Sequence, residues 1–148
     1  MSNPTLTLVR GLPGSGKSTY AKKAMEIKYG KTPTKWDKKH VLYEADQFFI
    51  ADNGQYNYDQ PFIAIAHDWC FSSTVKALKD GYDVWVANTF CNFQEMERYL
   101  GLGEIIPNLN IEVYVCKNKF KSIHNVPDGV IEKMKARWQN FNDEIVIK

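Results

Sequence analysis

The sequence lacks any long apolar run and any pair of cysteines spaced as C-x-x-C. Without an apolar segment of about 20 residues, we expect no membrane-spanning helix. The cysteines are an odd number at wide spacing, which predicts neither a zinc site nor a disulfide framework. The first residues, 1–4, are not typical of a signal peptide. We therefore expect a cytoplasmic protein in a reducing compartment, with each cysteine filling a small apolar space: Cys70, Cys91 and Cys116.

The chain also carries little net charge. Its formal charge is +2 over 148 residues, which argues against a protein that binds nucleic acid mainly through electrostatics, although a local basic groove remains compatible with it. Hydrophobic residues make up 44% of the chain and charged residues 24%, an ordinary balance for a globular protein. The aromatic share of 14% is high and can support a dense core. At this length we expect a single domain over residues 1–148.

One glycine-rich stretch carries the clearest chemistry. Residues 11–19 match G-x-x-x-x-G-K-[ST], the phosphate-binding loop, between an apolar strand and a run of helix formers. The glycines allow a tight turn, so successive amide groups can surround a polyanion at the start of a helix. We expect Lys17 to bridge the terminal phosphates and the Ser18 hydroxyl to bind Mg²⁺. The predicted nucleotide-binding residues are Gly11, Leu12, Pro13, Gly14, Ser15, Gly16, Lys17, Ser18 and Thr19.

Apolar strands and helical segments alternate along the whole sequence. This alternation predicts an α/β fold with a parallel sheet and right-handed crossovers. The carboxyl ends of such strands surround the ligand, so polar residues there are candidates for the site. Strands are expected at 6–9, 41–45, 83–89, 110–116 and 144–147, and helices at 18–29, 61–79, 92–106 and 127–140.

Two strand ends supply polar candidates. Asp46 falls at the end of the second expected strand, where it can hold Mg²⁺ through water or act as general base on an acceptor hydroxyl. The simpler interpretation is that it caps a helix over 47–50, and both roles are compatible. The third expected strand ends in Asn88 and Thr89 without a carboxylate. These two side chains can bond to water or phosphate, or simply cap the strand end.

Two loops supply the remaining candidates. Turn-forming residues at 51–58 predict a small hairpin or flap, in which Tyr56 and Tyr58 either stack on an acceptor base or pack on the domain. A basic loop spans 117–127. In it, His124 either orients the loop or contacts phosphate when protonated, with a structural role as the alternative. The phosphate-contact candidates in and after this loop are Lys119, Lys121, His124 and Arg137.

Four motifs, taken in order, resemble one kinase family. They lie at 11–19, at 44–49, at 88–90 with 95–96, and at 122–127 with 134–138. Together they are similar to the zeta-toxin/polynucleotide-kinase-like branch of phosphate-loop kinases, especially the small AAA-33-type ATP-binding proteins of phages and bacteria. The resemblance implies a three-layer, adenylate-kinase-like α/β core with five parallel strands in the order 2-3-1-4-5. It also implies ATP and Mg²⁺ as cofactors, a lid at about 117–127, and a location in the bacterial cytoplasm or a phage-infected host.

The same resemblance assigns roles to individual residues. Asp46 matches the general base that acts on a 5′-hydroxyl, and the predicted catalytic set is Asp46, Lys17 and Lys121. Three positions depart from the family pattern. Ala87 replaces an acid near the end of the third strand, and Phe49 replaces an arginine that binds the acceptor's phosphate. Lys121 replaces a lid arginine, which keeps the point charge without the bidentate fork.

The motifs favour a kinase that transfers the γ-phosphoryl group of ATP to a hydroxyl. The 5′-hydroxyl of a nucleic acid is the first acceptor to consider, followed by a nucleoside or a sugar nucleotide. The alternative, motivated by the three departures, is a non-catalytic ATP-binding module that acts through a protein partner. A simple ATPase or GTPase ranks last, because no sensor arginine, catalytic glutamine or guanine-specific N-K-x-D motif is recognisable.

Overall fold

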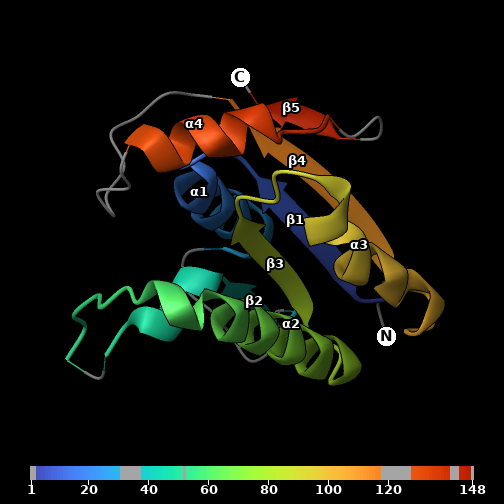
Figure 1. Cartoon of the computed structure of the whole chain (residues 1–148). Helices are drawn as coiled ribbons and strands as arrows, with labels where there is room; N and C mark the ends of the chain where they lie inside the picture. The colour runs from blue at the N-terminus through green and yellow to red at the C-terminus, as the bar shows by residue number, and fades with distance from the viewer. Residues whose placement is uncertain (1–2, 31–37, 52, 118–127, 141–143, 148) are drawn as a thin grey trace.

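Five parallel strands form one sheet at the centre of the computed structural model, which describes residues 3–30, 38–51, 53–117, 128–140 and 144–147. The spatial order is β2-β3-β1-β4-β5 (Figure 1), which confirms the expected α/β fold and strand order. The strands are β1 (Thr5–Arg10), β2 (His40–Tyr43), β3 (Asp83–Asn88), β4 (Asn110–Cys116) and β5 (Ile145–Ile147).

Helices connect the strands, as the alternating pattern predicts. Gly30 ends the first helix in a left-handed conformation (φ 95°), and its N–H donates to the Glu26 carbonyl. The Asn92 side chain caps the third α-helix by accepting from the Glu95 N–H at 3.1 Å. The α-helices are α1 (Lys17–Tyr29), α2 (Ile63–Lys79), α3 (Phe93–Leu100) and α4 (Asp128–Ala136), and the 3₁₀ helices are η1 (Ala45–Phe49), η2 (Gln60–Phe62) and η3 (Gly101–Glu104).

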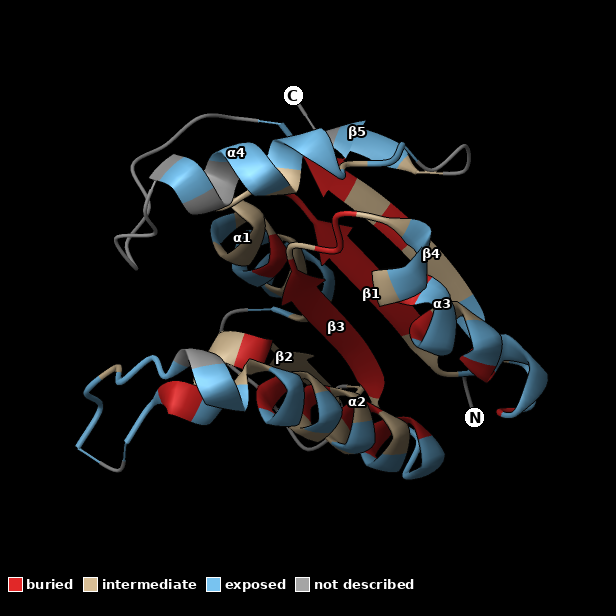
Figure 2. Cartoon of the chain, in the orientation of Figure 1, coloured by how far each residue is buried: buried red, intermediate tan, exposed pale blue. Residues whose placement is uncertain are grey.

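Alternating side chains of the central strands build a three-layer core. On one face, Leu6, Leu8, Val84 and Val86 pack with buried residues of α2 and α3. On the other face, Trp85 and its neighbours pack against α1. Figure 2 shows β1 and β3 almost wholly buried between these layers, so the residues that follow them are held by a rigid scaffold. Within the described part of the chain, no helix is long and apolar enough to cross a membrane.

Several element ends differ from the expectations. The second strand ends at Tyr43 instead of residue 45, and the chain turns there into η1. Asp46 lies inside η1, whose N-cap is Glu44, so the N-cap role considered as the simpler interpretation of Asp46 is wrong. The helix expected at 92–106 continues beyond Leu100 only as η3, where Gly101 and Gly103 lower helix propensity.

The last helix is also shorter than expected. It ends at Ala136, whereas the sequence pattern extends it to residue 140. Directly after it, the Gln139 N–H donates to the Cys91 carbonyl at 2.7 Å, and the Gln139 side chain accepts from the Phe93 N–H at 2.9 Å. These bonds to the segment after β3 replace the bonds that a continuing helix would make. The free cysteines Cys70, Cys91 and Cys116 are all buried, as expected.

Candidate functional site

The glycine-rich loop connects β1 to α1 and closes tightly at its start. Gly14 and Gly16 have φ values of 81° and 89°, in the left-handed region that favours glycine. A Cβ on Gly11 would lie 2.2 Å from Ser15 Oγ and 2.8 Å from the Cys116 carbonyl oxygen. Ser15 Oγ is buried and has no hydrogen-bond partner among the described residues. This free hydroxyl, together with first-turn amides that lack partners within α1, fits a bound anion.

Gly11→Ala is expected to weaken ATP binding about tenfold or more, equivalent to about 1.4 kcal/mol. The added methyl group would overlap the Ser15 hydroxyl and a backbone oxygen, so the loop must open. Calorimetric titration with ATP measures the loss. Gly101→Ala is the matched control, because nothing lies within 4 Å of its added Cβ and its φ is −64°. Equal ATP affinity in the two variants would contradict the close fit of the loop.

Lys17 is the first residue of α1 and faces two carboxylates. The residue is partly exposed, but desolvation of its ammonium group dominates and lowers the pKa of Lys17 below its usual value of 10.5. The nearby carboxylates of Asp46 and Glu44 offset part of this effect by favouring the charged form. The loop lysine and both acids therefore share one electrostatic environment.

The lowered pKa of Lys17 predicts a pH dependence of stability. Between the folded pKa and 10.5 the unfolded chain binds more protons than the folded chain, so the free energy of unfolding gains a contribution that rises with pH. Urea unfolding without nucleotide, from pH 7.5 to 10, should show wild type gaining stability relative to Lys17→Met as the pH increases. A difference that stays constant or reverses with pH would contradict the desolvated lysine.

Glu44 was not among the residues predicted for the site. The expected strand over 41–45 would have enclosed it, but β2 ends at Tyr43 and leaves Glu44 as the first residue beyond the strand. There its carboxylate accepts a hydrogen bond from the Ser18 hydroxyl. The signal in the sequence was an acid two positions before Asp46, beside the end of an apolar strand.

Ser18 and Glu44 also bear on Mg²⁺ binding. Within the described ranges, no group of three or more His, Cys, Asp or Glu side chains could hold a metal ion. Mg²⁺ does not need such a cage, because it is usually held by one or two side chains together with substrate phosphates and water. A hydroxyl with a carboxylate beside it, at the edge of a phosphate-binding loop, fits this arrangement.

Asp46 accepts a hydrogen bond from a tyrosine. The Tyr56 hydroxyl donates to Asp46 Oδ1 at 3.1 Å. Burial raises the pKa of Tyr56 above its usual value, and the neighbouring Asp46 adds to the effect. Tyr56 pairs with Ile50 in an antiparallel bridge, a contact that fits the small hairpin, one of the two expectations for this segment.

The Asn88 side chain links the end of β3 to η1 through a hydrogen bond. Its Oδ1 accepts from the Ala45 N–H at 2.9 Å, and its Nδ2 lies 3.6 Å from Cys70 Sγ as a donor. The neighbouring Thr89 carbonyl accepts from the Gly11 N–H at 3.3 Å. Of the roles considered for Asn88, the structure therefore favours a bond at the strand end, one that also sets the start of the 3₁₀ helix carrying Asp46.

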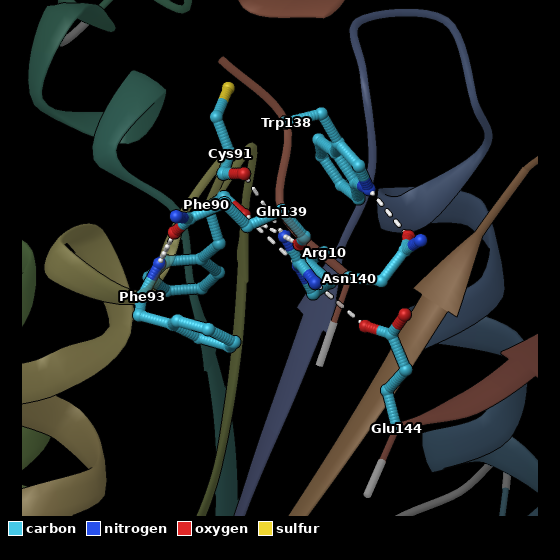
Figure 3. A network of polar contacts seen from close by, with 8 residues as sticks. All are labelled: Arg10, Phe90, Cys91, Phe93, Trp138, Gln139, Asn140 and Glu144. Carbon is cyan, nitrogen blue, oxygen red and sulfur yellow. Dashed lines mark hydrogen bonds and ion pairs between the residues drawn. The ribbon is translucent and has the colours of Figure 1, made fainter. Parts of the chain in front are cut away.

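Arg10 is the second residue of importance that was not predicted. Its guanidinium is fully buried at the end of β1 and donates to the carbonyls of Phe90 and Gln139 and to the Glu144 carboxylate, at 2.6 to 2.9 Å. The Trp138 ring lies over it, 4.0 Å from Cζ to the ring centroid. Figure 3 shows these groups converging on Arg10 from three chain segments. One side chain thus ties the entry of the phosphate loop to the residues after α4.

Of the phosphate-contact candidates in and after the predicted lid, only Arg137 lies among the described residues. Arg137 follows α4, its side chain is about half exposed, and its Nε lies 3.9 Å from a Glu95 carboxylate oxygen. Lys119, Lys121 and His124 lie outside the described residues. The structure therefore brings together the loop, Lys17, Ser18 and Asp46 from the predicted set, and the roles of all these residues stay predictions.

Comparison with known proteins gives the family. The model of AAA_33, described as an AAA domain, matches residues 6–140. NEDD4-binding protein 2 of Homo sapiens is 29% identical over 124 residues, which cover 83% of this chain but only 6% of that protein. The uncharacterized protein PM0531 of Pasteurella multocida (strain Pm70) is 28% identical over 143 residues, covering 88% of this chain and 74% of that protein.

Solved structures share the fold at low sequence identity. A chain of the Pnkp1/Rnl/Hen1 RNA repair complex has a TM-score of 0.64 at 18% identity, covering 93% of this chain and 44% of that one. Chaetomium thermophilum Kti12 in complex with ADP-AlF3 has a TM-score of 0.66 at 11% identity, covering 96% and 88%. A putative kinase from Chloroflexus aurantiacus has a TM-score of 0.64 at 15% identity, covering 99% and 88%. With this fold, its phosphate-binding loop and a family match over residues 6–140, the chain belongs to the AAA_33 family and has a phosphate-loop kinase fold.

Proposed function

We propose that this protein is an ATP-dependent kinase that transfers the γ-phosphoryl group to a hydroxyl acceptor. The observation that carries the proposal is the position of two acids beside the phosphate loop at the carboxyl edge of the sheet. Glu44 accepts a hydrogen bond from Ser18, Asp46 lies in the 3₁₀ helix that follows, and both carboxylates act on Lys17. A loop that binds a triphosphate needs only the lysine and the amides. The additional acid beside the lysine is what phosphoryl transfer to a hydroxyl requires.

The donor half of the proposed site is the phosphate loop. Its amides, from Gly11 to Thr19, would bind the β- and γ-phosphate oxygens of ATP, and the Lys17 ammonium would neutralise their charge. Ser18 would be the direct ligand of Mg²⁺, with Glu44 accepting from its hydroxyl and so orienting it. When bound, Mg²⁺ supplies charge neutralisation on the phosphate oxygens.

Asp46 is the proposed general base of the acceptor half. Its carboxylate would take the proton of the acceptor hydroxyl while the acceptor oxygen bonds to the γ-phosphorus and the bond to the β,γ-bridging oxygen breaks. The products are ADP and a phosphate monoester. The Tyr56 hydroxyl, which donates to one carboxylate oxygen, would hold Asp46 in place. In this scheme Tyr56 is a positioning residue.

The lid remains part of the proposal. Lys121, with Lys119, would bring positive charge to the transferring phosphoryl group, and His124 and Arg137 are further candidates. These positions belong to the predicted lid at about 117–127 and the residues that follow it, within the predicted single domain over 1–148. Nucleic-acid 5′-ends, nucleosides and sugar nucleotides are the acceptor classes to be compared. The likeness to a chain of an RNA repair complex supports including nucleic acid.

A specific observation keeps the non-catalytic alternative in view. The end of β3 carries Ala87, which is buried, and no carboxylate. Phe49 is 6% exposed and packs against Tyr58 with ring centroids 5.2 Å apart. These positions contribute packing instead of charge, as they would in a module that binds ATP and signals to a protein partner.

An acceptor screen tests the proposal. Labelled ATP and Mg²⁺ are incubated with each acceptor class, and phosphorylated products are identified by mass spectrometry for wild type and for Lys17→Ala. We expect one acceptor class to gain phosphate with wild type and none with Lys17→Ala. ATP that binds wild type in the micromolar range, with no phosphate transferred to any acceptor, would favour the non-catalytic module instead.

A further inference from the structure

The segment that carries Asp46 contains acids but no basic residue. Between Val41 and Val75 there is not one lysine or arginine. This stretch begins in β2, includes η1, which carries Asp46, and extends through η2 and most of α2. These elements lie along one side of the molecule in Figure 1. Its acidic residues are Glu44, Asp46, Asp52, Asp59 and Asp68.

The same segment carries a cluster of aromatic rings in contact, which we call the aromatic wall: Phe48, Phe49, Tyr56 and Tyr58. Phe48 and Tyr58 are 38% and 51% exposed. Buried Phe49 lies between them, with ring centroids 5.5 Å from Phe48 and 5.2 Å from Tyr58. Tyr56 and Tyr58 are nearly parallel, at 16°. The wall is therefore a set of rings packed on one another, of which Phe48 and Tyr58 are partly exposed to solvent.

The aromatic wall is continuous with the proposed acceptor half of the site. Phe48 is two residues from Asp46 in the same 3₁₀ helix. Tyr56 touches Asp46 directly, through its hydroxyl at 3.1 Å. A molecule whose hydroxyl reaches Asp46 would consequently have this wall within reach of its neighbouring atoms.

Arg98, the basic residue that α3 places beside this segment, already forms an ion pair. Arg98 Nη1 lies 2.9 Å from Asp68 Oδ1, and its guanidinium lies over the Phe71 ring at 4.7 Å. His67, which lies on α2 next to Asp68, has its pKa lowered chiefly by burial and faces Glu95, Arg98, Asp46 and Asp68, so carboxylates outnumber cations around it. Lys17 belongs to the phosphate loop.

We infer that the acceptor is an uncharged molecule that carries both a hydroxyl and a flat ring system, as a nucleoside does, and not the end of a nucleic-acid strand. The inference rests on the proposed kinase function. Strand binding depends on lysine and arginine contacts to successive phosphates, whereas this side offers acids that repel them. Stacking of a base on an aromatic side chain needs no charge and contributes about 1–3 kcal/mol.

Matched acceptors test this directly. Thymidine, thymidine 3′-monophosphate and a 5′-hydroxyl oligothymidylate present the same terminal ring and hydroxyl with increasing negative charge. With saturating ATP, we expect kcat/KM to be at least about tenfold higher for thymidine than for the oligothymidylate. The ratio of the two values should decrease as the salt concentration rises, because salt screens the repulsion between the acidic side chains and the phosphates. An oligothymidylate that is the better acceptor would overturn the inference.

Substitutions in the aromatic wall test whether its rings bind the acceptor, and a surface substitution elsewhere controls for non-specific effects on the protein. Phe48→Leu and Tyr58→Leu should each raise the KM for thymidine about five- to tenfold, the equivalent of about 1.0–1.4 kcal/mol of lost stacking, with the KM for ATP unchanged. Asp59→Lys should improve the oligothymidylate relative to thymidine. Ile27→Ala removes an apolar side chain that is 79% exposed on α1 and should change neither KM.

The outcomes also distinguish this inference from the kinase proposal. Phosphate transfer that requires Lys17 but shows the same acceptor KM in the leucine variants as in wild type overturns the inference alone. If wild type binds ATP but phosphorylates none of the three acceptors, nor any acceptor of the wider screen, both fail together. Calorimetric titration of thymidine into protein loaded with a non-hydrolysable ATP analogue gives the same comparison without turnover.

Discussion

Asp46→Asn is expected to reduce kcat by about 10²–10⁴-fold while leaving ATP affinity within about twofold of wild type. Asparagine retains an oxygen that can accept from the Tyr56 hydroxyl, but it cannot take up a proton from the acceptor. Steady-state kinetics with the acceptor found by screening gives kcat, and calorimetric titration gives the ATP affinity. A loss of Mg²⁺-dependent ATP affinity with little change in kcat would instead assign Asp46 to holding the hydrated metal ion.

Tyr56→Phe is the companion to that experiment. It removes the hydroxyl that donates to Asp46 at 3.1 Å and keeps the ring in the aromatic wall. The expected loss in kcat is about tenfold or less, because the base is still present but less well held. An equal loss in both variants would mean that the tyrosine hydroxyl itself takes part in the chemistry.

Arg10→Met is expected to lower the free energy of unfolding by about 3–5 kcal/mol. The guanidinium is fully buried, and its removal leaves the Glu144 carboxylate, whose side chain is 6% exposed, without its 2.7 Å partner. It also leaves the carbonyls of Phe90 and Gln139 without their donor. Urea unfolding followed by circular dichroism measures the change.

Arg98→Met provides the matched control for the buried arginine. Arg98 pairs with Asp68 at 2.9 Å, but the two side chains are 40% and 71% exposed, and solvent-exposed ion pairs contribute about 0–1 kcal/mol. We therefore expect its loss of stability to be much smaller than that of Arg10→Met. Similar losses in the two variants would contradict the role assigned to the buried network.

The fold was predictable because its signals are local. Apolar runs bounded by glycine and proline predict the strands, and the loop at 11–19 has the strand and helix flanks that its motif requires. The strand order came from the family resemblance, since no local pattern says which strands pair. The helix ends were less predictable, because contacts with distant segments decide them. Gln139, just after the end of α4, forms hydrogen bonds with the segment that follows β3.

The site was predictable in part, for a related reason. Lys17, Ser18 and Asp46 stand in recognisable motifs, whereas Glu44 belongs to the site only because β2 stops one residue before it. Arg10 was missed because its partners lie 80 to 134 positions away in the sequence. A charged residue at the end of an otherwise apolar central strand was the available signal, since a buried charge must be paired.

The most direct test of the kinase assignment follows where the γ-phosphoryl group goes. In one reaction with labelled ATP, Mg²⁺ and the preferred acceptor, both the phosphorylated acceptor and free phosphate are quantified against the ATP consumed. The account predicts that acceptor phosphate matches ATP consumption for wild type and that both vanish in Lys17→Ala. Label recovered only as free phosphate, or remaining entirely in ATP, would contradict it.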